Sequence, residues 1–340
     1  MTDNISAQKV REMRAAIEQA VAQIRSAVKY TEVERLIIAG DVEGVIDLLG
    51  LDKSAFAPLL ESARDSYKTG ADYTAEVLSP IPTPVGSIQF RFDMTSTDAV
   101  QWLSTLSSNL ITEVVEDQRE MVRTVLAGYT AQGVNPRTQA LDLVGRVDKT
   151  SGKRVGGFIG LTTQQSQWVQ NARAELESLD ANYLTRALRD KRFDATIIKA
   201  IKNNEQLPRS TIDAAITRMQ SRALKYRADT IARTEAINAL RAGQAQSIAN
   251  AIERGKITEN EVTKEWDSSG DDGRTRDSHL MMEGQKQRFP DPFITIEGYR
   301  LMYPGDSSLG APGKETIQCR CRAIYRIDFI GVSRRVDGFR

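Results

Sequence analysis

Hydrophobic residues recur every three or four positions through most of the first 250 residues of the chain. The first such stripe continues over five turns and consists of Val10, Met13, Ile17, Val21, Ile24 and Val28. This spacing places its members on one face of an α-helix. A helix or helix pair is predicted over 56–77, and the cap residues at 95–97 predict a long helix to about residue 128. Another helix is predicted from Pro208 to about Glu253.

The pattern changes near Thr258, where short alternating segments replace the helical spacing. These segments are VTKEW, FITI, YRLMY and TIQCRCRAIYRIDF, and turn-rich loops separate them. Alternation with a period of two is typical of half-buried strands. We therefore predict an α+β fold, with a largely helical N-terminal body and a small C-terminal α+β domain that contains a short antiparallel sheet. The expected regions are 1–160 (helical), 161–257 (long helix with a basic segment) and 258–340 (α+β domain).

Composition excludes several classes of protein. Of the 340 residues, 40% are hydrophobic and 27% are charged, as in ordinary globular proteins. No apolar run approaches the ~18 residues that a membrane span needs, and the N-terminus lacks the apolar core of a signal peptide. We therefore expect no membrane anchor. Two cysteines cannot form a disulfide framework, so folding in a reducing compartment is expected.

The net charge of +1 hides a basic segment. Residues 186–241 contain 13 Lys/Arg and 6 Asp/Glu, a net charge of +7. Such a segment is either a basic helix face in water or a surface that contacts a polyanion. If it contacts DNA, Lys225, Arg227 and Arg241 are candidates for binding phosphates without sequence preference.

The two cysteines lie two positions apart, at Cys319 and Cys321. In a strand over 317–329 both thiols would point to the apolar face, and arginines would line the other face. A disulfide is disfavoured, because such residues have Cα atoms roughly 6.6 Å apart and parallel side chains. Two interpretations remain. Either both cysteines are buried core residues, or they bind zinc with His279 as third ligand and Asp277, Asp306 or water as fourth.

Asp and Arg residues are concentrated in the segment WDSSGDDGRTRDSH, which also contains His279, the only histidine. Such residues commonly stabilise turns and form local ion pairs. The functional alternative is a metal-dependent nuclease or other hydrolase in which His279 is a base or a metal ligand. A single histidine can fill one of these roles but not both. We therefore assign no catalytic residue and do not expect an enzyme.

The order of motifs in the C-terminal third resembles the Mu F-like family of tailed-phage minor head proteins, also called head morphogenesis proteins. The resemblance covers about residues 225–330. Two departures are a Gly between Asp272 and Arg274 and Gln318 where Asn is expected. The matching residues are Arg233, Thr234, Glu235, Trp266, Asp272, Arg274, Thr275, Arg276, His279, Gly284, Pro304, Gly305, Asp306, Cys319, Arg320 and Cys321.

This resemblance implies a minor structural protein that acts in head morphogenesis. Its implied partners are the portal protein, the major capsid or scaffold proteins and, without sequence preference, double-stranded DNA. Its implied location is the virion, inside the head near the portal vertex, after assembly in the host cytoplasm. Roles in DNA packaging or ejection are also implied. No cofactor follows from the resemblance, and zinc at the cysteines stays a hypothesis from the residues alone.

Overall fold

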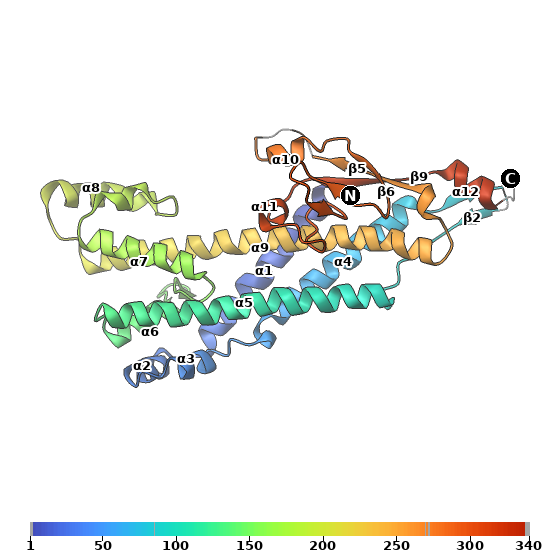
Figure 1. Cartoon of the computed structure of the whole chain (residues 1–340). Coiled ribbons are helices and arrows are strands. Elements are labelled where there is room, and N and C mark those ends of the chain that lie inside the picture. Colours follow the sequence, from blue (N-terminus) through green and yellow to red (C-terminus); the bar gives the residue numbers. More distant parts are fainter. Residues whose placement is uncertain (1–2, 85, 269, 271–272, 337–340) are drawn as a thin grey trace. The chain divides into compact units, whose positions relative to one another are not determined.

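The computed structural model describes residues 3–84, 86–268, 270 and 273–336 (Figure 1). It is mostly helical and contains short antiparallel sheets of two or three strands. The predicted α+β class, a helical body followed by a small α+β region, is therefore confirmed. Within the described residues, no helix is both long and apolar enough to cross a membrane.

The predicted helices occur with nearly the expected bounds. The α-helices are α1 (Asp3–Ala27), α2 (Tyr30–Ile38), α3 (Val42–Leu48), α4 (Ala57–Leu78), α5 (Thr97–Ala131), α6 (Pro136–Val144), α7 (Thr163–Glu177), α8 (Asp194–Asn203), α9 (Arg209–Glu253), α10 (Asp277–Leu280), α11 (Gly313–Thr316) and α12 (Phe329–Val336). Short 3-10 helices are η1 (Lys53–Phe56), η2 (Ala181–Thr185), η3 (Lys191–Phe193) and η4 (Glu259–Glu261). The strands are β1 (Ile81–Thr83), β2 (Gly86–Ile88), β3 (Arg146–Val147), β4 (Arg154–Val155), β5 (Val262–Asp267), β6 (Lys286–Arg288), β7 (Phe293–Ile294), β8 (Arg300–Leu301) and β9 (Arg322–Ile327).

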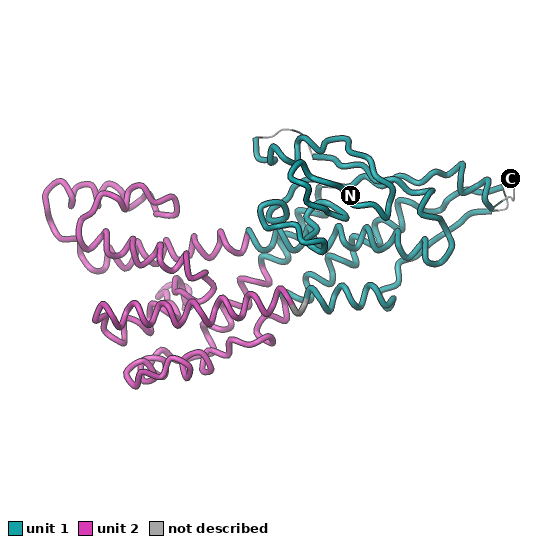
Figure 2. Tube along the Cα trace, in the orientation of Figure 1, with its two compact units in different colours: residues 1–14, 59–107, 230–340 teal, residues 15–58, 108–229 magenta. Residues whose placement is uncertain are grey.

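The chain forms two compact units, and neither is one continuous segment (Figure 2). Unit 1 contains 1–14, 59–107 and 230–340, and unit 2 contains 15–58 and 108–229. The continuous regions 1–160, 161–257 and 258–340 that the sequence suggested stay a prediction. The four unit boundaries fall inside helices α1, α4, α5 and α9, where hydrophobic periodicity gives no signal of a boundary.

Unit 2 is a helical assembly around a buried glycine-rich loop. Residues 156–161 of this loop are buried. Buried polar side chains bind the backbone of this loop: Gln220 accepts from Gly157 N (2.8 Å), and Gln118 accepts from Gly160 N (2.6 Å). These bonds satisfy polar groups that water cannot reach, so the loop forms part of the core of unit 2.

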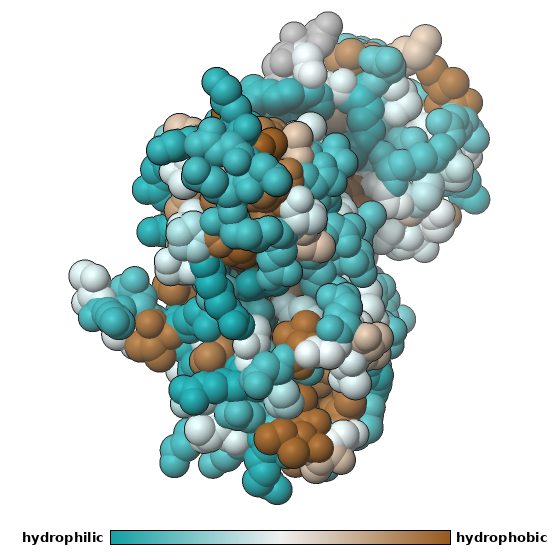
Figure 3. All heavy atoms as spheres, turned by 90° about the vertical axis from the view of Figure 1, so that its left-hand side faces the viewer, coloured by the Kyte–Doolittle hydropathy of each residue, from teal (hydrophilic) through white to brown (hydrophobic). Residues whose placement is uncertain are grey.

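The surface of unit 2 is largely polar. The face drawn in Figure 3 shows separate hydrophobic areas among hydrophilic ones, not one continuous apolar surface. Ile38 and Ile198 are among the large hydrophobic side chains that unit 2 exposes. Scattered exposed apolar residues of this kind are normal on protein surfaces and indicate no particular partner.

In unit 1, helices α4 and α9 approach each other closely at two glycines. A Cβ atom added to Gly70 would lie 1.9 Å from the carbonyl oxygen of Leu240, and one added to Gly243 would lie 2.0 Å from that of Tyr67. Only glycine permits this contact between backbones. Around it, Tyr67 stacks on Trp102 with ring centroids 4.4 Å apart. This packing holds α9 against α4, and the C-terminal elements of unit 1 pack on α9.

The C-terminal region of unit 1 contains an antiparallel sheet with strand order β6-β5-β9. One hydrophobic cluster joins this sheet to helices α4, α9 and α12 and includes Ala75, Ile248, Val262, Ile327 and Val332. Ala323 pairs with Trp266, and Arg322 pairs with Asp267 and forms a salt bridge to it (3.2 Å). Adjacent pairs of residues therefore alternate between the covered face and the open face of the sheet.

The long final strand expected over 317–329 is wrong in its extent. Helix α11 ends at Thr316, Gln318 has a left-handed backbone (φ 55°), and β9 begins at Arg322. Ile317 and Phe329, expected on the apolar face, are exposed. The alternating residue pattern was present, but a positive φ at Gln318 interrupts the extended chain, and side-chain periodicity does not reveal such a turn.

Lys264 of β5 is a buried charged residue with a side chain only 1% exposed. Its ammonium group donates to the carbonyl of Met302 (2.6 Å) and lies 5.0 Å from the ring centre of Phe293. Burial lowers the pKa of Lys264 to about 8, while the carboxylates of Asp306 and Asp291 act in the opposite direction. The folded protein therefore holds this proton less tightly than the unfolded chain does.

We expect Gly70→Ala and Gly243→Ala each to lower the free energy of unfolding by about 1–3 kcal/mol, because the added methyl group forces α4 and α9 apart. The matched control is Gly128→Ala in α5, where an added Cβ would meet only Gln170 Oε1, at 3.6 Å. This control should leave stability unchanged or raise it by up to about 1 kcal/mol through helix propensity. Chemical denaturation measures all three, and equal effects at the three sites would contradict the close contact.

We expect the stability of the wild type relative to Lys264→Met to rise between about pH 8 and pH 10, by about 1–3 kcal/mol. In that window the unfolded state binds more protons at this residue than the folded state does, so raising the pH favours folding. Lys286→Met, which replaces an exposed lysine of neighbouring β6, is the control. Denaturation midpoints across this pH range test the prediction, and parallel curves for the wild type and Lys264→Met would refute it.

Candidate metal centre

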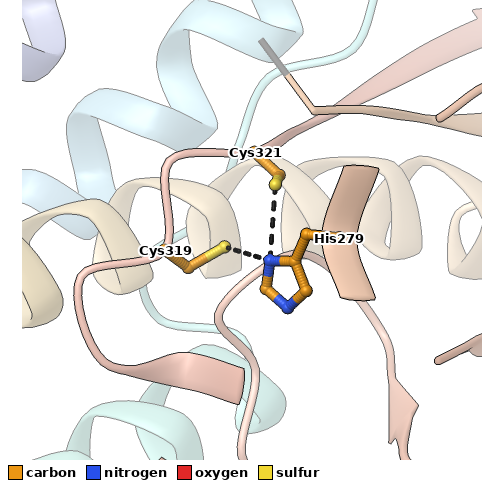
Figure 4. Close-up of side chains that lie close together, drawn as sticks. All are labelled: His279, Cys319 and Cys321. Atoms are coloured by element: carbon orange, nitrogen blue, oxygen red, sulfur yellow. Dashed lines mark hydrogen bonds between the residues drawn. The ribbon is translucent and has the colours of Figure 1, made fainter. Parts of the chain in front are cut away.

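His279, Cys319 and Cys321 converge inside unit 1 (Figure 4). The imidazole Nδ1 lies 3.7 Å from the sulfur of Cys319 and 3.4 Å from that of Cys321. The three side chains are buried, with residue exposures of 1%, 3% and 0%. Among the described residues, only these three bring ligand atoms of a metal-binding type within 4.8 Å of one another.

The distances are those of ligands around one tetrahedral ion. Zinc binds sulfur at about 2.3 Å and nitrogen at about 2.0 Å, so tetrahedral geometry separates a sulfur and a nitrogen ligand by roughly 3.5 Å. The two observed sulfur–nitrogen distances, 3.4 and 3.7 Å, lie on either side of this value. Two sulfurs and one imidazole can therefore hold a metal ion without rearrangement of the backbone.

Glu315 fixes the orientation of the imidazole. Its carboxylate Oε2 lies 2.8 Å from Nε2 of His279, and both side chains are almost completely buried. A carboxylate at this nitrogen favours the tautomer with hydrogen on Nε2. The lone pair of Nδ1 then points at the two sulfurs. A carboxylate that receives the remote N–H of a histidine ligand is a common outer contact in metal sites.

Aromatic residues enclose the cluster. The ring of Trp266 packs edge-on against His279, and that of Phe293 packs edge-on against Trp266, each at a centroid distance of 5.2 Å. The indole Nε1 of Trp266 is buried with no conventional acceptor, but its contact with Cys321 favours the thiolate form of that residue. Met282 completes the apolar packing. The shell is apolar, and the indole N–H of Trp266 lies beside the sulfur of Cys321.

A tight turn supported by helix α9 brings both cysteines to the same side. The backbone N–H of Gln318 donates to the hydroxyl of Thr234 (3.1 Å), and its side-chain amide donates to that of Thr230 (2.8 Å). These bonds stabilise the left-handed conformation at Gln318, which is costly for a residue other than glycine. The turn thus depends on two threonines that are one helical turn apart on α9.

Arg241, which also lies on α9, binds the backbone of the same region. Its guanidinium group is buried and donates to the carbonyl of Pro304 (2.9 Å) and to that of Cys319 (3.2 Å). Gly305 has a positive φ of 87°, and a Cβ there would lie 3.1 Å from Arg241 Nη1. The Pro-Gly turn therefore brings its backbone close to the arginine that also holds Cys319.

The pKa values of the two thiols are shifted in opposite directions. The hydrogen bond from Cys321, the positive charge of Arg241 and the contact with His279 lower the pKa of Cys319 well below the ordinary value. Donation of that hydrogen bond, together with burial, raises the pKa of Cys321. A thiolate at Cys319 is already favoured, and metal binding requires deprotonation of the second thiol as well.

The carboxylates suggested as fourth ligand do not join the cluster. Asp277 is exposed, although it begins helix α10 only two residues before His279. Asp306 is buried, but its carboxylate accepts from the backbone N–H groups of Met302 and Ser308, both at 2.9 Å. The Asp306 side chain thus stabilises its own loop, as turn-forming aspartates commonly do.

The other residues of the resemblance have structural positions. The guanidinium group of Arg276 donates to the carbonyl of Ile317, which connects the start of α10 to the turn before Cys319. Gly284 adopts a positive φ of 73° after α10. Asp272 lies outside the described residues. Arg274 is exposed, whereas Arg233, Glu235 and Arg320 are half-buried.

Two of the three suggested DNA contacts are buried inside the protein. Arg227 forms a salt bridge to Asp117 (2.5 Å) within unit 2, and Arg241 binds the two carbonyls described above. Neither guanidinium group is presented to a phosphate. Lys225 is exposed. Periodicity could not separate these residues, because an arginine that binds buried carbonyls has no special spacing in the sequence.

Glu315 and Thr230 were missed by sequence reasoning. Glu315 lies four positions before Cys319, but a single glutamate at this spacing is not a known metal-site signature. Thr230 precedes the Arg-Thr-Glu motif by one helical turn, which suggests a shared face of the helix but no partner. Both roles depend on contacts between residues more than 30 positions apart.

We expect Arg241→Met to lower the free energy of unfolding by about 2–4 kcal/mol, because two buried carbonyls lose a charged donor. The control is Lys225→Met, an exposed position on the same helix, which should change stability by less than about 0.5 kcal/mol. Denaturant titrations of both variants measure the difference. Comparable effects would contradict the anchoring role of Arg241.

Comparison with known protein families supports the resemblance. Residues 181–324 match the family model described as Phage Mu protein F like protein. The match includes Thr234 and Arg241 of α9 and the residues of the His279 cluster. Searches of curated proteins and of solved structures found no match. Residues 181–324 of this chain are thus similar to the phage Mu F-like family, as the order of motifs in the sequence suggested.

Proposed function

We propose that this chain is a minor structural protein of a tailed-phage head, associated with the portal and inner capsid. It would act during head morphogenesis and contribute to DNA packaging or ejection. The observation that carries this proposal is the family match over residues 181–324, which covers both the supporting helix α9 and the histidine–cysteine cluster. A head morphogenesis family implies contact with other head components, inside the virion.

The surroundings of His279 support a structural role over the hydrolase alternative. The imidazole is 1% exposed, one nitrogen faces Glu315, and the other faces two sulfurs. A general base must reach a proton of the substrate or of the attacking water. His279 is instead occupied on both nitrogens by residues of its own unit. A structural role therefore accounts for His279 better than nuclease activity does.

Contact with packaged DNA is a subsidiary part of the proposal. Much of the positive charge in 186–241 is neutralised locally, as in the salt bridges Arg186–Glu175, Arg189–Asp194 and Arg192–Asp190. Lys225 stays exposed and could approach phosphates. Any such contact would weaken strongly with salt and would show no sequence preference. DNA is thus a neighbour inside the head in this account, and the portal or capsid is the principal partner.

The prediction is that the tagged full chain co-purifies with the assembled portal ring of the same phage when the two are co-expressed. Nuclease treatment and high salt should leave the complex intact, because the contact is between proteins. An unrelated protein with the same tag is the control. Absence of association with both portal rings and procapsids would overturn the proposal.

Incubation of the purified protein with plasmid DNA and divalent metal ions distinguishes the structural role from the nuclease alternative. The proposal expects the plasmid to stay intact over the whole range of protein concentrations. Cleavage that disappears in His279→Ala but persists in the control Asp277→Asn would instead support the hydrolase, since only His279 belongs to the buried cluster.

A further inference from the structure

Three potential metal-ligand atoms in unit 1 lie close together. They are Nδ1 of His279 and the sulfurs of Cys319 and Cys321, with pairwise separations below 4.8 Å. We propose that they bind one zinc ion, with Glu315 as the residue that positions the imidazole. This inference is independent of the proposed role in the phage head.

The hydrogen-bonding capacity of the cluster argues for a metal ion over simple core packing. With hydrogen on Nε2, the nitrogen Nδ1 has a single lone pair, yet two sulfurs lie near it, at 3.4 and 3.7 Å. Only one thiol can donate to that lone pair, so the imidazole offers no hydrogen bond to the second sulfur. A metal ion uses the lone pair of nitrogen and those of both sulfurs at once. It therefore satisfies all three groups within a buried site.

The kinds of ligand select zinc among common ions. Two thiolates and one imidazole suit zinc, whereas magnesium and calcium prefer oxygen ligands. The described residues supply three ligands, and we assign the fourth position to a water molecule. On binding, each thiol that is still protonated releases its proton to the solvent, so the ion is held by two thiolates.

The outer contacts fit the same assignment. Glu315 accepts the N–H of His279, the indole N–H of Trp266 lies beside Cys321, and Arg241 binds the carbonyl of Cys319. These contacts orient each ligand from a different element: α11, β5 and α9. The ion would connect α10 to the segment that precedes β9, and its role would be to hold this region together.

The first experiment is elemental analysis of the full chain, purified without chelators from cells grown with zinc. The expected content is about one zinc per chain. Cys321→Ser and His279→Ala should lose the metal, and the matched control Asp277→Asn should keep it. No zinc in the wild type after refolding with zinc, or equal loss in Asp277→Asn, would overturn the site.

Glu315 is tested separately as a positioning residue. Glu315→Gln should weaken zinc affinity about 10- to 100-fold in competition with a chromophoric chelator, because the imidazole loses its orienting carboxylate. Glu297→Gln replaces an exposed glutamate paired with Lys314 and is the matched control, with unchanged affinity. Equal affinities of the two variants would remove Glu315 from the proposal.

Wild-type protein provides a test that does not depend on the folding of variants. After exchange of the metal for cobalt(II), thiolate-to-cobalt charge-transfer bands and the visible bands of tetrahedral cobalt are expected. Metal removal should also speed hydrogen exchange in 276–282 and 315–323, and leave the 146–155 hairpin of unit 2 unchanged. Spectra of octahedral cobalt, or exchange that does not respond to the metal, would contradict the proposal.

Discussion

The C-terminal region of unit 1 depends on a buried imidazole that must have a partner on each nitrogen. His279 meets this need with the carboxylate of Glu315 on one side and the sulfurs of Cys319 and Cys321 on the other. A buried polar ring without such partners would cost more than an average hydrogen bond contributes. The requirement brings together α10, α11 and the segment before β9, around which Trp266, Met282 and Phe293 pack.

Helix α9 makes this arrangement possible by using two of its faces. Thr230, Thr234 and Arg241 are spaced by 4 and 7 residues, so they share one face, and all three bind the turn or loops around the cysteines. Gly243 lies on the other side of the helix, where the backbone of α4 approaches. The Arg-Thr-Glu motif and the distant Cys-Arg-Cys motif are thus parts of one structural unit, which explains why they occur together in the sequence.

The sequence predicted what depends on local periodicity. The stripe from Val10 to Val28 gave α1, and the continuous apolar pattern after Pro208 gave α9 almost to the residue. It also identified His279, Cys319 and Cys321 as a group, because histidine and cysteine are rare in this chain. Whether they hold zinc stays a proposal.

Features that depend on distant contacts could not be predicted. The left-handed turn at Gln318 requires the hydroxyl of Thr234, which is 84 positions away, so the expected continuous strand was wrong. The burial of Arg227 and Arg241 depends on Asp117 and on the carbonyls of Pro304 and Cys319. Charge along the sequence does not distinguish such arginines from exposed ones. The same limit applies to Glu315, whose role appears only when α11 meets α10.

X-ray absorption at the zinc edge of the purified full chain tests the central claim most directly, because it reports the atoms bound to the metal. The account predicts two sulfur neighbours at about 2.3 Å and two nitrogen or oxygen neighbours at about 2.0 Å. A first shell of oxygen and nitrogen alone, at the longer distances of a surface-bound ion, would contradict it.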